Sequence, residues 1–164
     1  MYTLILAPLD GSPTAEAALP HAEALAVRFG ASLVLLRVVS PAAAVVPAMA
    51  PASPALVHPA GVVDPGRLLE VDRQEADNYL QAKAAELAAR QVAAVAERQE
   101  GDPAEVIRHR ARELRASVLV MTTHGRSGLG RLIFGSVADS VLRGSPCPVL
   151  LVRVAGEARA ERPK

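Results

Sequence analysis

The chain has few of the residues on which several classes of protein depend. Its 164 residues include a single cysteine, Cys147, no tryptophan, two phenylalanines and two tyrosines. One cysteine excludes an internal disulfide framework, and so few aromatic side chains leave no platform on which single-stranded bases would stack. The 18 basic and 17 acidic residues nearly balance, so no strong field selects nucleic acid or an anionic membrane. We expect neither as a partner.

The first residues lack the pattern of a secretion signal. Residues 1–9 show no basic start followed by an apolar stretch and a small-residue cleavage site, so the cytoplasm is the expected location. Residues 41–63 are uncharged and long enough to suggest a membrane span, but five prolines would break a spanning helix. We expect residues 41–66 to form a Pro/Ala-rich loop inside the domain, either a tolerated insertion or a functional lid.

Short apolar runs alternate along the chain with segments of helical spacing. A chain of this length has room for one core, and we assign residues 1–155 to a single domain followed by a polar tail over 156–164. Strands are expected at 4–8, 33–39, 92–96, 117–121 and 149–152, and helices at 12–30, 67–90, from 103 onward and around 136–143. The alternation predicts an α/β fold with a doubly wound, five-stranded, mainly parallel sheet and helices on both faces. Ligands of such sheets bind at the carboxyl ends of the strands.

The segment after the fourth expected strand is rich in glycine. Residues 125–135 contain four glycines, and a helix is expected to start at Ser136. Glycine lets the backbone approach an oxyanion closely, and the free amides of a helix start attract negative charge. The segment from Thr122 to Ser136 is therefore predicted to hold the phosphates of a nucleotide. The alternative is that the glycines only turn the chain and cap the helix.

Other glycine-rich motifs fit this segment less well. Gly130 and Gly135 have the spacing of a P-loop, but Ser136 stands where that motif requires lysine. A dinucleotide fingerprint would need its third glycine at Ile133, and a hydrolase serine elbow would need glycine at Leu129. The sequence argues against a Walker NTPase, an NAD-binding domain and a serine hydrolase.

At these residues the chain resembles the universal stress protein family. Nucleotide-binding members carry a glycine, two residues, a second glycine, nine residues, and a third glycine followed by serine or threonine. Gly125, Gly135 and Ser136 match this pattern, while Thr122 occupies the first glycine position. Residues 7–12, 101–103 and 146–149 also resemble the family. The resemblance implies a Rossmann-like fold of the adenine-nucleotide alpha hydrolase kind.

The resemblance also implies a ligand, ATP, with Mg²⁺ or Mn²⁺ arriving with it. Asp10 and Val38 would border the adenine and ribose, and Asp10 would accept hydrogen bonds from the ribose hydroxyls. The residues expected around the ribose and phosphates are Met121, Thr122, Gly125, Gly135, Ser136 and Val137. We add Arg126 and Arg131 as side chains that would neutralise phosphate charge, with a solvated basic surface as their alternative role.

Three functions remain in competition. The first is a stress-response sensor or regulator in which ATP biases a conformational or partner-binding equilibrium, with hydrolysis slow or absent. The second is a nucleotide-independent stress protein that acts through dimerisation and protein contacts, with Thr122 closing the pocket. A nucleotide hydrolase or transferase ranks last, because the sequence reveals no nucleophile–base arrangement. The resemblance implies a homodimer paired through residues 149–152, and an exposed apolar strand edge suits such pairing.

Histidine and cysteine do not indicate further chemistry. The four histidines fall on separate elements without the spacing of metal ligands, so we expect no metal site built from protein alone. His124 is expected to order its loop through a backbone hydrogen bond. Cys147 stands between two prolines before an apolar run, where we expect a buried, inert thiol.

Overall fold

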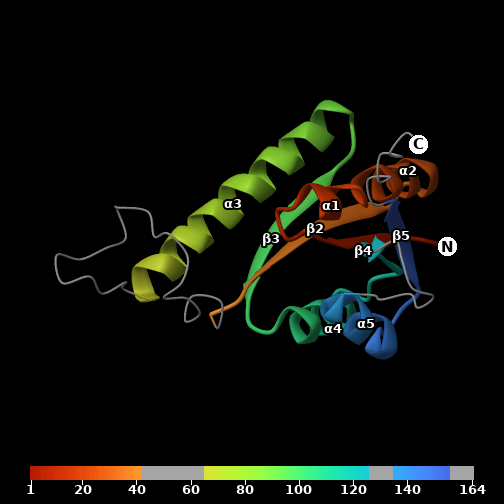
Figure 1. Ribbon diagram of the computed structural model, residues 1–164. Helices are drawn as coiled ribbons and strands as arrows, with labels where there is room; N and C mark the ends of the chain where they lie inside the picture. Colours follow the sequence, from red (N-terminus) through yellow and green to blue (C-terminus); the bar gives the residue numbers. More distant parts are fainter. Residues whose placement is uncertain (42–64, 126–134, 156–164) are drawn as a thin grey trace, which may run out of the picture.

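The structure is a computed structural model that describes residues 1–41, 65–125 and 135–155. One five-stranded sheet lies between two layers of helices (Figure 1). In chain order the elements are β1 (Leu4–Pro8), α1 (Pro13–Glu16), α2 (Leu19–Phe29), β2 (Ser32–Val39), α3 (Pro65–Ala89), β3 (Ala94–Glu100), α4 (Pro103–Glu113), β4 (Val118–Gly125), α5 (Ser136–Gly144) and β5 (Val149–Ala155). The expected α/β architecture is confirmed.

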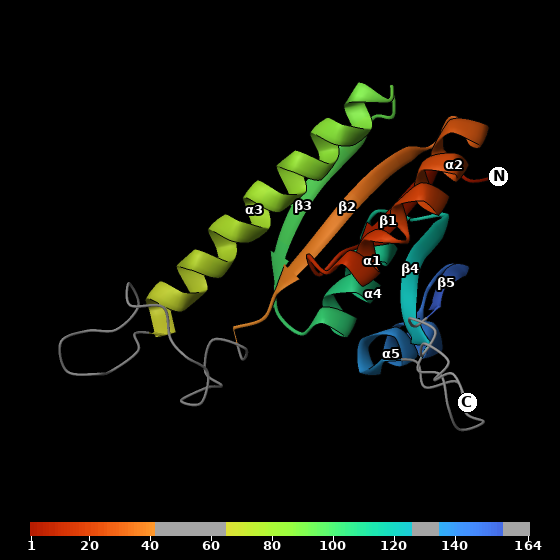
Figure 2. The ribbon, with the colours of Figure 1, turned by 45° about the horizontal axis from the view of Figure 1, so that its top comes forward.

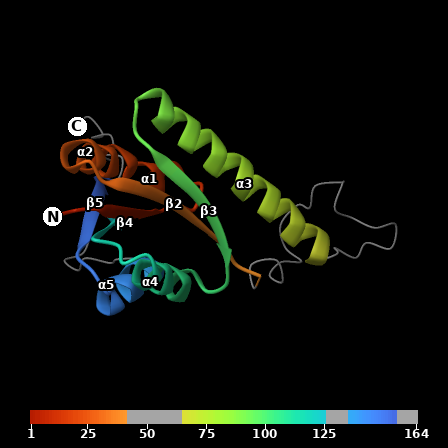
Figure 3. The ribbon, with the colours of Figure 1, turned by 180° about the vertical axis from the view of Figure 1, so that it is seen from behind.

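The strand order is β3-β2-β1-β4-β5, and each neighbouring pair is parallel. Helices α1, α2 and α3 cover one face, and α4 and α5 cover the other, as the view from behind also shows (Figure 3). The central strand β1 is closed off from water on both faces, since Ile5, Leu6 and Ala7 are fully buried. This explains why its sequence is a continuous apolar run.

Ser117, directly before β4, binds the backbone at the beginning of β1. Its Oγ accepts hydrogen bonds from the amides of Thr3 and Leu4 at 2.9 and 3.0 Å and donates one to the Leu4 carbonyl at 2.7 Å. A single hydroxyl thus satisfies three backbone groups at the amino-terminal edge of the sheet.

The first expected helix, residues 12–30, is divided in two. Ser12 caps α1, because its Oγ accepts the Ala15 amide at 3.1 Å. The chain then turns at residues 17–18, and α2 begins with Pro20 near its start. Proline has no amide hydrogen for the carbonyl four residues earlier, and its ring collides with that carbonyl. The prediction of one continuous helix was wrong because it overlooked Pro20.

Strand β3 was expected at 92–96 but runs from Ala94 to Glu100. Its length follows from pairing, since all seven of its residues are in register with Leu33–Val39 of β2. The added residues are charged or polar, as an edge strand allows. Val92 is buried before the strand begins. The apolar residues of this segment predicted where the strand lies, but pairing with β2 determines where it ends.

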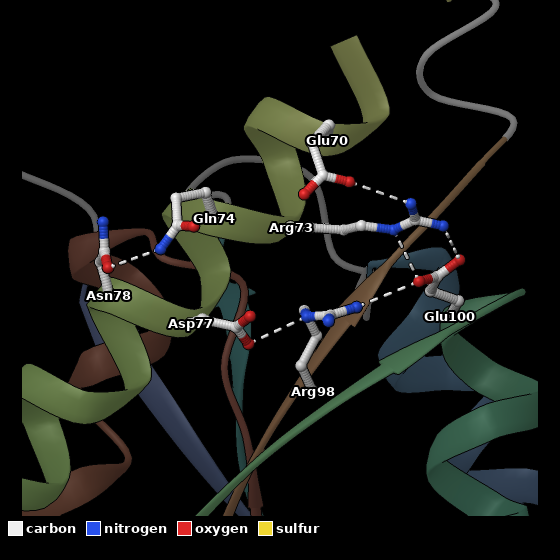
Figure 4. Close-up of polar contacts among 7 residues, drawn as sticks. All are labelled: Glu70, Arg73, Gln74, Asp77, Asn78, Arg98 and Glu100. Atoms are coloured by element: carbon white, nitrogen blue, oxygen red, sulfur yellow. Dashed lines mark hydrogen bonds and ion pairs between the residues drawn. The ribbon is translucent and has the colours of Figure 1, made fainter. Parts of the chain in front are cut away.

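Ion pairs fasten α3 to this edge strand (Figure 4). Arg73 holds the Glu100 carboxylate with two hydrogen bonds, of 2.8 and 2.9 Å. Arg98 links Asp77 on α3 at 2.9 Å with Glu100 at 3.0 Å. The arginine hydrogen bond holds the pKa of the Glu100 carboxyl below its ordinary value. Figure 2 shows the result, with α3 lying along β3.

Strands β4 and β5 are also longer than expected, ending at Gly125 and Ala155. Thr122 therefore belongs to a strand and not to the loop that follows, and it pairs in register with Val152. Pairing between β4 and β5 extends both strands beyond the apolar residues from which they were predicted. The expected loop at 41–66 and the tail at 156–164 lie almost wholly outside the described residues.

Candidate functional site

The candidate site lies where the sheet changes its winding direction. The chain leaves β1 toward β2 on one side, whereas β4 pairs with β1 on the other side. Connections that diverge in this way leave a crevice at the carboxyl ends of the two central strands. A pocket of about 310 Å³ opens there, which is at the small end of the range for small-molecule sites.

Most of the pocket wall is apolar. The side chains come from strands β1, β2 and β4, from the residue after β1, and from helices α1, α4 and α5. They belong to Pro8, Leu9, Ala15, Leu36, Val38, Pro103, Ile107, Met121, Val137 and Ala138. The polar side chains among the described lining residues are Asp10, Thr122 and Ser136. An apolar wall with a few polar groups suits a ligand that has a flat apolar part and a polar end.

Asp10 is presented by a tight turn after β1. Its Oδ1 accepts the amide of Ser12 at 2.8 Å, and Gly11 between them has a φ of +86°, which a side chain rarely permits. One carboxylate oxygen therefore shapes the turn. No hydrogen bond from a described residue reaches the other oxygen, and Asp10 is exposed. That oxygen is available to accept hydrogen bonds from a ligand.

The start of α5 forms a second polar wall. Gly135 is its N-cap and provides no side-chain hydrogen bond. The amides of the first helical turn have no intrahelical acceptor, and Gly135 and Ser136 both line the pocket. These amides and the helix dipole favour an anionic group at this point.

An arginine holds together the two helices on this side of the pocket. Arg108 of α4 donates to the carbonyl of Ser140 at 3.0 Å and to its hydroxyl at 2.7 Å, and it also pairs with Glu105. The Arg108 side chain passes so close to Gly144 that a Cβ there would lie 2.7 Å from its Cδ. The position of α5 relative to the pocket therefore depends on contacts with α4.

The predicted site residues are largely brought together. Seven of them line the pocket: Asp10, Val38, Met121, Thr122, Gly135, Ser136 and Val137. Gly125 is the last residue of β4. Arg126 and Arg131 lie outside the described residues. The structure thus groups these positions, and their roles toward a nucleotide remain predictions.

Sequence reasoning missed several apolar lining residues. Leu36 could have been found, because a strand residue two positions from Val38 shares its face. Ile107 on α4 belongs to the core and is 3% exposed. It also borders the pocket, because α4 begins beside the strand ends. No local pattern distinguishes a core side chain from one that lines a cavity.

The remaining candidates add no chemistry. Among the described residues no group of three potential ligands is placed to hold a metal. Cys147 is half-buried, not fully buried as expected, and its Sγ lies 3.8 Å from the Ser145 hydroxyl. No helix within the described ranges is long and apolar enough to cross a membrane.

Comparison with known proteins identifies what the chain is similar to. The model of the universal stress protein family matches residues 1–153. A universal stress protein of Methanocaldococcus jannaschii is 33% identical over 153 residues, which are 93% of this chain and 83% of the relative. The solved structure of a universal stress protein from Lactobacillus plantarum has a TM-score of 0.71 at 27% identity, covering 93% of this chain and 98% of its own.

Two further solved structures with this fold contain nucleotides. A universal stress protein in complex with cAMP has a TM-score of 0.65 at 22% identity, covering 94% of this chain and 98% of its own. A universal stress protein from Archaeoglobus fulgidus in complex with dAMP has a TM-score of 0.60 at 18% identity, with 92% and 97% covered. At these identities the likeness shows a shared fold.

Proposed function

Because the chain belongs to the universal stress protein family, we propose that it is an adenine-nucleotide-binding module that regulates a stress response. ATP is the proposed ligand, and its binding shifts a conformational or partner-binding equilibrium. The observation that carries the proposal is the meeting of Asp10 and the start of α5 in one apolar pocket at the switch point of the sheet. The cAMP and dAMP complexes of proteins with this fold support the same ligand class.

Each part of a nucleotide has a matching surface. Val38, Met121 and Ile107 offer apolar walls to the adenine ring. The free oxygen of Asp10 is the acceptor for ribose hydroxyls. The amides that follow Gly135 are the donors for a phosphate group. Thr122 narrows the pocket where the family pattern has glycine and adds a hydroxyl that can donate to the ligand.

The described residues argue for binding without rapid hydrolysis. Asp10 is the single ionisable side chain among the lining residues that the structure describes, and its Oδ1 is already engaged by the Ser12 amide. A general base or nucleophile requires a partner within hydrogen-bond reach, which this part of the chain does not supply. With one carboxylate at hand, Mg²⁺ or Mn²⁺ would be held mainly by phosphates and water.

A nucleotide-independent function through protein contacts is the second candidate. Strand β5 lies at the edge of the sheet, and Leu150 on it is 37% exposed. We propose that residues 149–152 pair with a second copy of the chain, in keeping with an apolar edge that would otherwise face water. Under either function we propose one domain over residues 1–155 acting in the cytoplasm. A monomer in sedimentation at micromolar concentration would contradict the dimer.

Isothermal titration with ATP and Mg²⁺, after denaturing extraction to identify any carried-over nucleotide, tests the first proposal. The decisive variant is Gly135→Leu. Gly135 lines the pocket and has a φ of −54°, which all residues adopt, so leucine adds bulk at the pocket wall without requiring a strained φ. Ala85→Leu, at an exposed position of α3, is the matched control for added bulk.

Binding by the wild type and the control, lost in Gly135→Leu, is the expected result. Unchanged binding by Gly135→Leu would show that the nucleotide binds outside this pocket. No binding by the wild type and no extracted nucleotide would reject the nucleotide proposal in favour of the protein-contact function.

A further inference from the structure

Arg37 packs against the turn formed by Asp10, Gly11 and Ser12. Its neighbours Leu36 and Val38 line the pocket, and Arg37 stands between them on β2. Side chains alternate along a strand, and the guanidinium accordingly lies over the ring of Tyr79 on α3, 5.3 Å from its centroid. Arg37 thus connects α3 with the strand that forms one wall of the pocket.

No salt bridge joins Arg37 to a carboxylate of the described residues. The other half-buried arginines of the described chain, Arg73, Arg98, Arg108 and Arg110, each hold at least one carboxylate. Within the described ranges Arg37 has the Tyr79 ring as its contact and no ion pair. Half-buried arginines without a counter-charge are uncommon because desolvating a charge is costly. A structural or binding role of the guanidinium would explain why a charged side chain occupies this position.

The same guanidinium fits against Gly11. A Cβ on Gly11 would lie 3.1 Å from Nη1 and 3.3 Å from Cζ of Arg37. The turn and the guanidinium are therefore in contact because residue 11 has no side chain. The residue before it, Asp10, supplies the carboxylate proposed to bind ribose. Moving Arg37 would therefore remove a packing contact of the turn that carries Asp10.

Tyr79 and its neighbours hold Arg37 in this place. Lys83 lies 6.0 Å from the centroid of the same ring and pairs with Glu16 at 3.0 Å. Burial, and then the Glu16 carboxylate, raise the pKa of Tyr79, whereas Arg37 opposes the rise and Asp10 adds to it. The Tyr79 phenol thus stays neutral, and it offers an uncharged aromatic face to the guanidinium. Tyr79 feels the charges of both Arg37 and Asp10, which places all three in one cluster.

We propose that Arg37, seated on Tyr79, is a positioning residue that holds the Asp10–Ser12 turn so that the Asp10 carboxylate meets the ribose hydroxyls of the bound nucleotide. This inference rests on the proposed nucleotide function. It makes α3 part of the binding apparatus, since the chain of contacts runs from Tyr79 through Arg37 and Gly11 to Asp10. A ligand at Asp10 and the placement of α3 are then coupled.

The test is to compare ATP with 2′,3′-dideoxy-ATP, which lacks the hydroxyls that Asp10 would bind. Arg37→Met keeps the length of the side chain and removes the guanidinium. It should weaken ATP about tenfold, as expected when a hydrogen bond to a charged group is misplaced, and leave dideoxy-ATP nearly unchanged. Arg37→Lys should recover part of the loss. Tyr79→Leu should resemble Arg37→Met, because it removes the seat of the guanidinium.

Arg90→Met is the matched control, since the exposed Arg90, directly after α3, pairs with the half-buried Glu23 at 2.7 Å and does not line the pocket. It should leave both affinities unchanged. An equal loss for ATP and dideoxy-ATP in Arg37→Met, or no loss for either, overturns the positioning role. A wild type that binds neither nucleotide rejects the proposed function itself, and with it this inference.

Discussion

Gly11 provides the sharpest test of the geometry beneath the pocket. Its φ of +86° makes any side chain strained, at a cost of about 1–2 kcal/mol for an L-residue. Alanine would also press against Arg37 at 3.1 Å and displace it from Tyr79, with a further loss of about 0.5–1 kcal/mol of cation–π interaction. Gly11→Ala should therefore destabilise the protein by about 1.5–3 kcal/mol, which lowers Tm by about 3–12 °C in a chain of this size.

Gly30 serves as the internal reference for this prediction. It caps α2 with a φ of +61°, and a Cβ there would meet nothing within 4 Å. Gly30→Ala should show the cost of backbone strain alone. In urea unfolding, Gly11→Ala should therefore lose about 0.5–1 kcal/mol more of the free energy of unfolding than Gly30→Ala. In an Arg37→Met background that excess should disappear. An excess that persists there would refute the view that Arg37 packs on the turn.

Three further outcomes are expected. Ser117→Ala should lower the free energy of unfolding by about 1–3 kcal/mol in urea titration, because it removes the hydroxyl that accepts the amides of Thr3 and Leu4; an unchanged midpoint would show that water replaces the hydroxyl. Ile107→Ala should cost about 2–5 kcal/mol by the same assay, since Ile107 is 3% exposed, and a smaller loss would mean that the pocket collapses around the deletion. The Arg73 hydrogen bond lowers the pKa of Glu100 below its ordinary value of 4.5. The stabilisation that the ionised Glu100 provides is therefore fully present above pH 4.5 and is lost as the pH falls through the lowered pKa. The Tm difference between wild type and Glu100→Gln should thus be greatest near neutral pH and shrink in acid, and a difference independent of pH would contradict an ionic origin.

The errors of sequence reasoning share a physical cause. The positions of the strands followed from short apolar runs, but the ends of β3 and β4 did not, because hydrogen bonding to a neighbouring strand extends a strand through polar residues. Pro20 divides a segment with continuous apolar spacing, which shows that one missing amide outweighs a favourable pattern. The half-buried state of Cys147 depends on how the turn before β5 packs, which no local pattern reports.

The sequence by itself determined the fold class, and it predicted the polar residues Asp10, Thr122 and Ser136 that line the candidate pocket. Alternating strand and helix patterns require a parallel sheet, and the match around Gly135 and Ser136 indicates where a ligand would bind. Tertiary structure alone decided which side chains surround the pocket and what supports them. Ile107, Tyr79 and Arg37 look in the sequence like ordinary helix and strand residues, and their roles follow from contacts between segments far apart in the chain. Such contacts depend on the relative placement of packed elements, which the local preferences of each segment do not specify.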